Sequence, residues 1–368
     1  MSLRGASLLK RVRWTVGVLA AFTVAACSAS PGQIAPASPA SQAPSAGSAL
    51  PSASGVSLKE ILRQPVGEDH VETVAFSPDG LRLAIGAEDG TVAVLKLQLQ
   101  PGEDAVIRKL HVGQTTGLAW SPDGKRLLTA AGDGSVRVSD PESLQVAYSV
   151  TAYPTTYPSV AWSPDGQRFA LAQGRNTVQL FEAKDGTLVD SFQVGDVRTR
   201  ALLWLPGGEV AASDETGRVA FFAAGQAKPV RIFQPDVAHK AVNSMSLSPD
   251  GQTLAIAYDD GALLLVNPAT AKLIRELPKG RQSGTVSWSP NGKLLALTSV
   301  SFDLKILDAG GALIARDDVG YDTNGTAWSP DGRYLAMGAD DKTLRVYELS
   351  PPQTPDRLRP TPPSFMGR

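Results

Sequence analysis

The sequence predicts an all-β protein, and three observations lead to that fold class. The tetrapeptide Ser-Pro-Asp-Gly, or a variant of it, occurs seven times at intervals of 40 to 44 residues. The 35 glycines and 27 prolines suit a chain with many turns, and short stretches between the turns alternate large and small residues as strands do. A mean period of 42 residues is typical of a blade of four strands. We therefore expect a seven-bladed β-propeller of four-stranded antiparallel blades.

The composition argues against several other classes of protein. The net charge is −1, so no basic surface for nucleic acid is expected. A single cysteine excludes a disulfide framework, and three histidines leave little material for a zinc site. The glycine-rich phosphate loop and the Gly-x-Ser-x-Gly elbow, which mark two large enzyme classes, do not occur in the sequence. We therefore expect no catalytic residue, no cofactor and no metal.

The first 26 residues have the features of a signal peptide. Four Arg and Lys residues and no acid precede an apolar run at 14–26, which is too short to span a bilayer. The run ends in Val24-Ala25-Ala26-Cys27 and resembles the lipobox of bacterial lipoproteins. The resemblance implies cleavage before Cys27 and attachment of a diacylglycerol to its thiol. An ordinary signal peptide beside a chance cysteine is the alternative.

Two segments on either side of the repeats lack the residues needed for a core. Residues 28–56 hold eight Ala, eight Ser, five Pro, three Gly and no charge, and residues 351–368 hold six prolines. We expect both to be disordered, with a root-mean-square reach of ~30 Å for the first. The chain thus divides into a signal peptide (1–26), the lipidated cysteine and tether (27–56), the propeller (57–350) and a proline-rich tail (351–368).

Each repeat is interpreted as four short strands, and the second repeat shows this well. Its strands are expected at 116–120, 126–131, 135–139 and 145–150, with a tight turn at 121–124. In that turn proline fixes φ, aspartate suits the next position, and glycine takes a left-handed conformation. The third strands of other repeats are expected at 91–97, 177–181, 263–266, 304–307 and 344–347. The fourth copy, Leu205-Pro206-Gly207-Gly208, departs from the pattern.

The seventh repeat has no fourth strand of its own, because it runs into the proline-rich tail. Residues 58–62, ahead of the first repeat, are apolar enough to form a strand and belong to no repeat. We expect them to supply the missing outer strand, which would close the ring and remove an open edge.

A bulky apolar residue precedes every turn, and five of the six tryptophans occupy this position. The seven residues are Phe76, Trp120, Trp162, Trp204, Leu247, Trp288 and Trp328. Such an array could stack on sugars, but packing between adjacent blades requires the same residues, and we favour packing.

Two stretches resemble the WD-repeat (WD40-like) β-propeller family. They are Ala-Trp-Ser-Pro-Asp-Gly-Lys-Arg-Leu-Leu from Ala119 and Asp-Gly-Ser-Val-Arg-Val-Ser-Asp from Asp133. The resemblance covers nearly all of residues 57–350, although the dipeptide that names the family is degenerate here. It implies that His111 and His239 form hydrogen bonds within their blades. It also implies a non-catalytic scaffold that binds proteins through the loops between blades.

Candidate contact residues lie in those loops. Tyrosine and arginine are common where binding energy concentrates. We therefore single out Tyr153, Tyr157, Arg198, Arg200, Arg281 and Tyr321.

The expected protein is a monomeric envelope lipoprotein, held by lipid on Cys27 at the periplasmic face of an outer membrane or on the cell exterior. Its expected partners are other envelope proteins.

Two other functions stay open. A hydrolase or lactonase would hold a metal in the central channel, and calcium accepts carboxylates from different blades. Carboxylate pairs occur at 259–260, 317–318 and 340–341, but the first and third fall in tight turns where aspartate usually binds backbone N–H groups. A cell-wall glycan-binding module would use aromatic loops. Carboxylates at the channel mouth would favour the enzyme, and a Tyr/Arg rim would favour protein binding.

Overall fold

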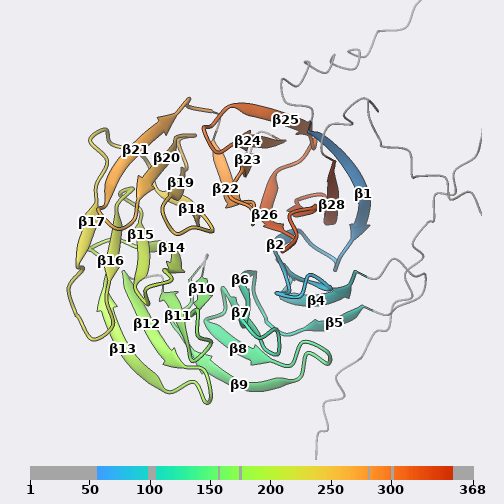
Figure 1. The fold of residues 1–368 in the computed structure, drawn as a ribbon. Helices are drawn as coiled ribbons and strands as arrows, with labels where there is room; N and C mark the ends of the chain where they lie inside the picture. Colours follow the sequence, from blue (N-terminus) through green and yellow to red (C-terminus); the bar gives the residue numbers. More distant parts are fainter. Residues whose placement is uncertain are drawn as a thin grey trace, which may run out of the picture.

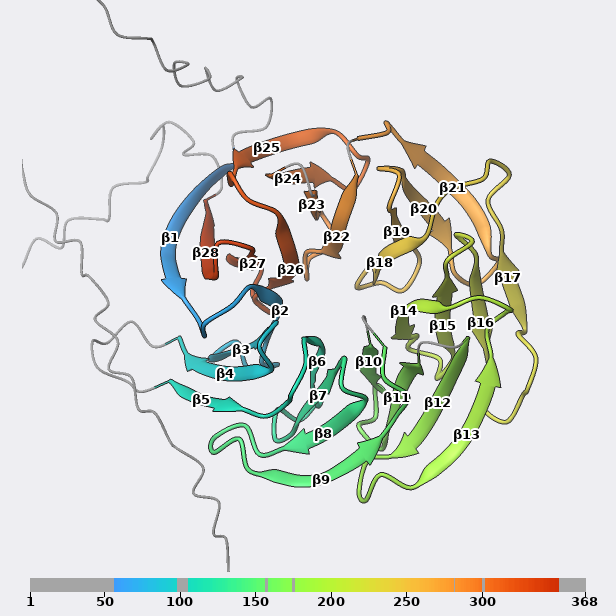
Figure 2. The same ribbon diagram turned by 180° about the vertical axis from the view of Figure 1, so that it is seen from behind.

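The structure, a computed structural model, describes residues 56–97, 105–155, 158–173, 176–280, 282–299 and 302–350. These residues form seven four-stranded antiparallel sheets arranged as blades around a common centre (Figures 1 and 2). The all-β, seven-bladed prediction is therefore confirmed. Among the residues described, no helix is long and apolar enough to cross a membrane.

Blades 1 to 6 each take four consecutive strands, ordered from the centre outward. Blade 1 contains β2 (Val71–Phe76), β3 (Arg82–Ala87), β4 (Thr91–Lys96) and β5 (Val106–Lys109). Blade 2 contains β6 (Thr115–Trp120), β7 (Leu127–Ala131), β8 (Ser135–Ser139) and β9 (Val146–Thr151). Blade 3 contains β10 (Ser159–Trp162), β11 (Arg168–Gln173), β12 (Thr177–Glu182) and β13 (Leu188–Gln193).

The second half of the ring repeats this order. Blade 4 contains β14 (Thr199–Trp204), β15 (Val210–Asp214), β16 (Val219–Phe222) and β17 (Arg231–Phe233). Blade 5 contains β18 (Val242–Leu247), β19 (Leu254–Tyr258), β20 (Leu263–Asn267) and β21 (Lys272–Leu277). Blade 6 contains β22 (Ser283–Trp288), β23 (Leu294–Ser299), β24 (Asp303–Asp308) and β25 (Leu313–Asp318). Blade 7 contains β26 (Thr323–Trp328), β27 (Tyr334–Ala339), β28 (Thr343–Ser350) and, outermost, β1 (Ser57–Pro65).

The ring closes as the sequence predicted. β1 pairs antiparallel with β28, so that Ser57 lies opposite Ser350 and Pro65 lies opposite Thr343. The two ends of the described chain therefore share one sheet (Figure 1). This pairing covers an edge that β28 would otherwise expose.

The alternating strand direction gives the propeller two different faces. The turn face carries the Ser-Pro-Asp-Gly turns and the turns between third and fourth strands. The crossover face carries the turns between second and third strands and the connections from one blade to the next. Because β1 begins opposite the last residue of β28, the described chain both starts and ends at the turn face.

The turns on the turn face are stabilised as their residue types suggest. In blade 2 the Ser121 hydroxyl donates to Asp123 Oδ1 at 2.6 Å and accepts from Arg126 N at 2.9 Å. The same Asp123 oxygen accepts from Lys125 N, and Gly124 has a φ of 68°. The bond from Ser121 and the bond from the Lys125 amide lower the pKa of Asp123. In the degenerate blade 4, Leu205 N bonds to Glu209 O, four residues on, and the blade still has four strands.

Buried apolar side chains gather between neighbouring blades. Within the described chain, seven hydrophobic clusters each join two adjacent blades. Trp120 belongs to the cluster between blades 1 and 2, and its Nε1 donates to Ala75 O across that boundary at 2.9 Å. Trp162 bonds to Ala119 O and Trp328 bonds to Ser287 O in the same way. The prediction that these tryptophans pack between blades is confirmed.

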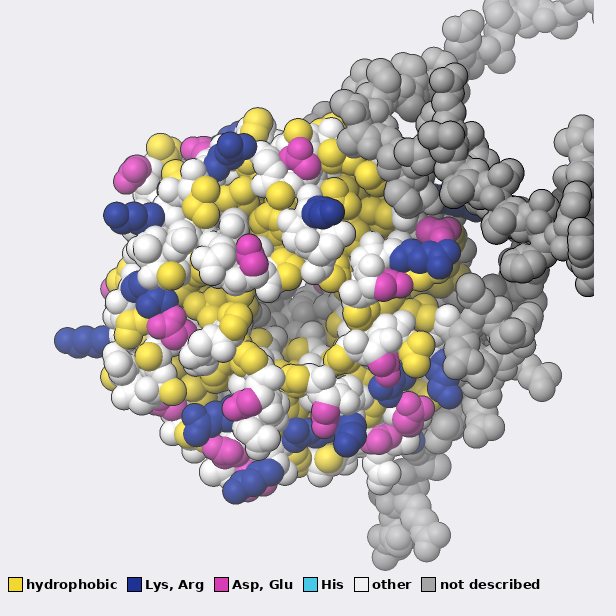
Figure 3. Space-filling view, in the orientation of Figure 1, with side chains coloured by type: hydrophobic (Ala, Val, Ile, Leu, Met, Phe, Trp, Pro, Cys, Tyr) yellow, Lys and Arg dark blue, Asp and Glu magenta, His cyan; other side chains and the backbone are white. Residues whose placement is uncertain are grey.

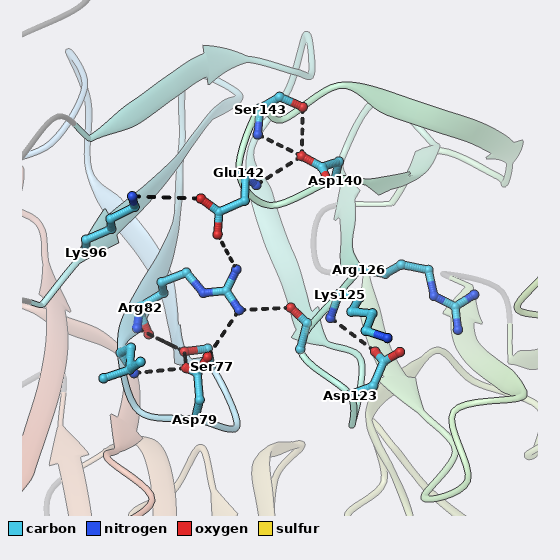
Figure 4. Close-up of polar contacts among 12 residues, drawn as sticks. Ser77, Asp79, Arg82, Lys96, Asp123, Lys125, Arg126, Asp140, Glu142 and Ser143 are labelled. Atoms are coloured by element: carbon cyan, nitrogen blue, oxygen red, sulfur yellow. Dashed lines mark hydrogen bonds and ion pairs between the residues drawn. The ribbon is translucent and has the colours of Figure 1, made fainter.

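Arginines on the turn face link the same neighbours. Arg82 Cζ lies 4.8 Å from the centre of the Trp120 ring, and its guanidinium donates to Gly124 O and to Glu142 of blade 2 (Figure 4). Arg126 repeats this arrangement one blade further on, over Trp162. The turn face therefore ties blades 1 to 3 together through fixed polar contacts.

Candidate partner-binding face

A recurring backbone contact fixes the loops of the crossover face. In the turn between second and third strands, one residue has a positive φ, and in six blades its carbonyl accepts a hydrogen bond from the connection that leaves the outer strand. These residues are Gly90, Gly134, Asn176, Gly261, Phe302 and Lys342. In blade 4 the carbonyl of Gly217 accepts from the Tyr258 hydroxyl instead. The connections between blades are therefore held against the turns beneath them.

Gly134 shows why the turn in blade 2 needs glycine. A Cβ atom at this position would lie 2.6 Å from the carbonyl oxygen of Ala152, and φ is 81°. Ala152 N also donates to Gly134 O at 2.7 Å. The next residue, Tyr153, is 61% exposed. Close backbone contact thus fixes the start of the loop that presents Tyr153 to solvent.

Blade 6 places an aromatic residue where most blades have glycine. Phe302 has a φ of 69°, a conformation that is costly for a bulky L-residue. Its side chain is 48% exposed on the crossover face, and its carbonyl accepts from Val319 N at 2.7 Å. Strained residues of this kind often occur at functional sites. Phe302 is not among the residues predicted from the sequence, although a phenylalanine at the position of the turn glycine would have indicated it.

Large apolar side chains are exposed in several loops of the crossover face. Of the described large hydrophobic residues that are exposed, Val112, Tyr153, Val237, Phe302 and Tyr321 lie there. They come from five different positions around the ring. Among the described residues, the turns of the opposite face expose two large hydrophobic residues, Leu81 and Val230. The loops of the crossover face thus expose more large hydrophobic residues than the turns of the opposite face, and the crossover face is the candidate site.

The structure brings three of the predicted residues to this face as expected. Tyr153, Arg198 and Tyr321 are exposed in connections between blades. Arg200 differs from the prediction: it lies within β14 rather than in a loop, it is half-buried, and its Nη2 donates to Asn243 Oδ1 in blade 5 at 3.0 Å. One nitrogen of the Arg200 guanidinium is therefore already engaged in a contact between blades 4 and 5. Tyr157, Arg281 and Cys27 lie outside the described residues.

Two histidines have internal structural partners, as the sequence analysis expected. The His111 side chain is buried, and its ring nitrogens lie 2.6 Å from Ser135 Oγ and 2.9 Å from Thr129 Oγ1 in the same blade. Burial, reinforced by the charge of Arg137, lowers the pKa of His111 to about 4. The imidazole ring is therefore neutral at pH 7, and its hydrogen bonds stabilise blade 2.

His239 has the equivalent role in blade 5. Its Nδ1 lies 3.1 Å from Asp260 Oδ2, which also accepts from Lys279 Nζ at 2.9 Å. Although burial raises it, these bonds hold the pKa of Asp260 at about 2. Asp260 Oδ1 accepts from Ala262 N, and in blade 7 Asp341 Oδ1 accepts from Thr343 N. Both carboxylate pairs thus lie in turns and bind backbone, as predicted.

One cluster on the crossover face has residues of the kind that bind metals. His70 Nδ1 lies 3.3 Å from Glu88 Oε2 and 3.6 Å from Asp340 Oδ1, where blades 1 and 7 meet. In the described part of the chain, Asp69, His70 and Glu88 are the group whose ligand atoms all lie within 4.8 Å of one another. Their side chains are about two-fifths exposed. Exposed acidic groups are common on surfaces without any ion, so the cluster alone does not indicate an enzyme.

Charged side chains of both signs are spread around the ring. Figure 3 shows lysines and arginines interspersed with carboxylates on the face in view, around a central hollow. This mixed pattern gives no single-sign field of the kind that steers nucleic acid.

Two family profiles match the chain. The profile described as the WD domain, G-beta repeat, matches residues 61–94, 107–140 and 320–348. The profile described as the WD40 domain of anaphase-promoting complex subunit 4 matches residues 155–207 and 210–286. No curated protein matches the chain at a significant level. The first profile matches segments that contain strands of blades 1, 2 and 7, and the second matches segments that contain strands of blades 3, 4 and 5.

Proposed function

Because this chain is a WD-repeat β-propeller, we propose that it is a non-catalytic scaffold that binds protein partners through its crossover face. The observation that carries the proposal is the set of exposed apolar side chains on that face, Val112, Tyr153, Val237, Phe302 and Tyr321. Aromatic side chains held on a rigid frame lose little entropy when they become buried in an interface.

The second part of the proposal places the protein at a bacterial cell envelope. The basic start, the short apolar run and the sequence Val24-Ala25-Ala26-Cys27 support a lipid anchor on Cys27, followed by a tether at 28–56. A monomeric propeller on this tether would contact other envelope proteins. The anchor is tested by mass spectrometry of the N-terminal peptide extracted from membranes. A cleaved, diacylated Cys27 supports it, and an unmodified cysteine contradicts it.

Partner binding is tested by crosslinking in the native host with a face-specific set of variants. The test protein carries Tyr153→Ala, Phe302→Gly and Tyr321→Ala, and the matched control carries Leu81→Ala on the turn face. We expect a stoichiometric envelope protein that is recovered with the wild type and the control and lost with the triple variant. Equal recovery with both variants would rule out the crossover face as the partner site.

One observation keeps the metal-dependent hydrolase as a second candidate. Asp69, His70 and Glu88 could supply two carboxylates and an imidazole to a divalent cation. The purified protein would then bind zinc, manganese or calcium in equilibrium dialysis and hydrolyse simple lactones. If the protein is such a hydrolase, His70→Gln should abolish both metal binding and lactone hydrolysis. Wild-type protein that neither binds a metal nor hydrolyses lactones would contradict this function.

A further inference from the structure

A second apolar surface lies far from the crossover face, on the outer strands of four consecutive blades. In blades 3 to 6 large hydrophobic residues lie near the start of the outermost strand or directly before it, and each is 38% to 53% exposed. We call these seven residues the apolar arc: Leu188, Val189, Val230, Ile232, Leu273, Ile274 and Leu313.

The strand direction places the apolar arc beside the turn face. Outer strands run from the turn face to the crossover face, and the residues of the arc lie within the first three positions of these strands or directly before them. Leu188 pairs with Phe181 near the end of β12, and Leu313 pairs with Leu307 near the end of β24. Because β13, β17, β21 and β25 follow one another along the rim, the residues of the arc are spread over about half of the ring (Figures 1 and 2).

The arc is specific to this half of the molecule. In β5 and β9, the outer strands of blades 1 and 2, no large hydrophobic residue is exposed among those described, and in β1 only Ile61 is. An outer strand pairs with the blade along one edge only, and side chains that no neighbouring blade covers meet solvent, so polar residues are expected at those positions. Repeated apolar residues in four adjacent blades therefore indicate a surface that something covers.

The position of the chain end indicates what covers it. Ser57 begins β1 at the turn face, so the predicted tether joins the propeller at the same face that the arc borders. A tether of 29 residues, with a root-mean-square reach of ~30 Å, keeps this face within reach of the bilayer but does not set its orientation. An apolar rim on that face would set it.

Three basic side chains beside the arc suit lipid phosphates, and Asp190 and Glu276 are acidic residues of the same strands. Lys184, Lys228 and Lys272 lie just before or at the start of the same outer strands and are exposed. None of them forms an ion pair within 4.0 Å among the described residues. Asp185, which follows Lys184, accepts a hydrogen bond from Thr187 N. Lysines can cover apolar surface with their stems while their ammonium groups reach phosphate oxygens.

We propose that the apolar arc rests on the lipid bilayer that holds the anchor, so that the turn face lies toward the membrane and the crossover face points away from it. The inference rests on the proposed lipid anchor and goes beyond it, because an anchor alone leaves the propeller free to rotate. The tether would hold the propeller at blade 7, and the arc would hold it at blades 3 to 6. The partner-binding face would then stay accessible to other proteins.

The test uses the lipidated full chain in vesicles of phosphatidylethanolamine and phosphatidylglycerol. Cys27 is the only cysteine and carries the lipid, so a polarity-sensitive dye can be attached to one introduced cysteine. Ile274→Cys reports on the apolar arc, Leu188→Cys repeats the measurement in another blade, and Val112→Cys, 87% exposed on the crossover face, is the control. Thermal unfolding verifies that each variant folds.

We expect the dyes at 274 and 188 to shift to shorter emission wavelength and to lose intensity when the vesicles contain brominated lipids. The dye at 112 should show neither change. If the protein floats with the vesicles and no position responds, or all respond equally, the inference is wrong and the anchor stands. If the protein does not float, the anchor itself is contradicted. A shift at 274 that depends on protein concentration and needs no vesicles would assign the arc to a second copy, which also overturns the proposal.

Discussion

The indole nitrogen of Trp120 donates a hydrogen bond of 2.9 Å to the main-chain oxygen of Ala75 in the preceding blade. Trp288 has the same place in blade 6 and the same 8% exposure, but its Nε1 is buried and has no hydrogen-bond partner among the residues that the structure describes. The two residues therefore share one packing role and differ in one hydrogen bond.

This pair separates the contribution of packing from that of the hydrogen bond. Phenylalanine at either position removes similar apolar volume, but only Trp120→Phe leaves a carbonyl without its donor. We expect Trp120→Phe to lower the free energy of unfolding by about 1 kcal/mol more than Trp288→Phe. Urea unfolding of both variants measures the difference. Equal losses would show that the bond to Ala75 adds nothing beyond packing.

Because β1 closes the ring, deleting it should lower the thermal stability of the protein markedly. Removing residues 57–64 takes away most of β1, exposes the edge of β28 and uncovers the clusters that Leu58 and Leu62 contact. We expect the melting temperature to fall by at least ~5 °C. Removing residues 351–368 is the control and should change it little. An unchanged melting curve after the first deletion would refute this closure.

Replacing Phe302 by glycine should raise the stability of the protein and weaken its binding to a partner. Glycine adopts a φ of 69° without strain, so Phe302→Gly should raise the free energy of unfolding by roughly 1 kcal/mol. The same change removes an exposed ring from the crossover face and should weaken partner capture. Differential scanning calorimetry and the crosslinking assay measure the two effects. Retained capture would remove Phe302 from the proposed site.

Because His111 is buried in its neutral form, the protein should lose stability in mild acid. Its pKa is lowered from 6.5 to about 4 in the folded protein, so the unfolded chain binds the extra proton between these two values. The stabilisation is fully present above pH 6.5 and is lost as pH falls toward 4, by up to about 3 kcal/mol. Urea unfolding at pH 7 and pH 5 should show a smaller decrease for His111→Gln than for the wild type. Equal decreases would contradict neutral burial of this ring.

Much of the fold could be predicted because its signals are local and periodic. The Ser-Pro-Asp-Gly turns recur at a spacing that suits a repeated four-strand unit, and the turn chemistry depends on residues within five positions of one another. Closure was predictable for a different reason. The seventh repeat lacked a strand, and residues 58–62 had no repeat to join.

The candidate site was only partly predictable, because exposure depends on chain segments that are far apart in sequence. Arg200 and Arg198 are two residues apart and chemically alike, yet Arg198 is exposed in a connection and Arg200 lies in β14 against Asn243 of the next blade. That difference follows from where β14 begins, which its pairing with β15 sets.

The sequence by itself determined the number of blades, the chemistry of their turns, the closing strand and the residues that resemble a lipid-anchor signal, because each depends on short spacings or on a repeat. Only the tertiary structure decided which exposed side chains lie on the same surface. It gathered Val112, Tyr153, Val237, Phe302 and Tyr321 on one face and aligned the apolar arc along the rim of the other. The physical reason is that strand direction and the packing of neighbouring blades, not the residue types alone, set which end of each strand faces which side.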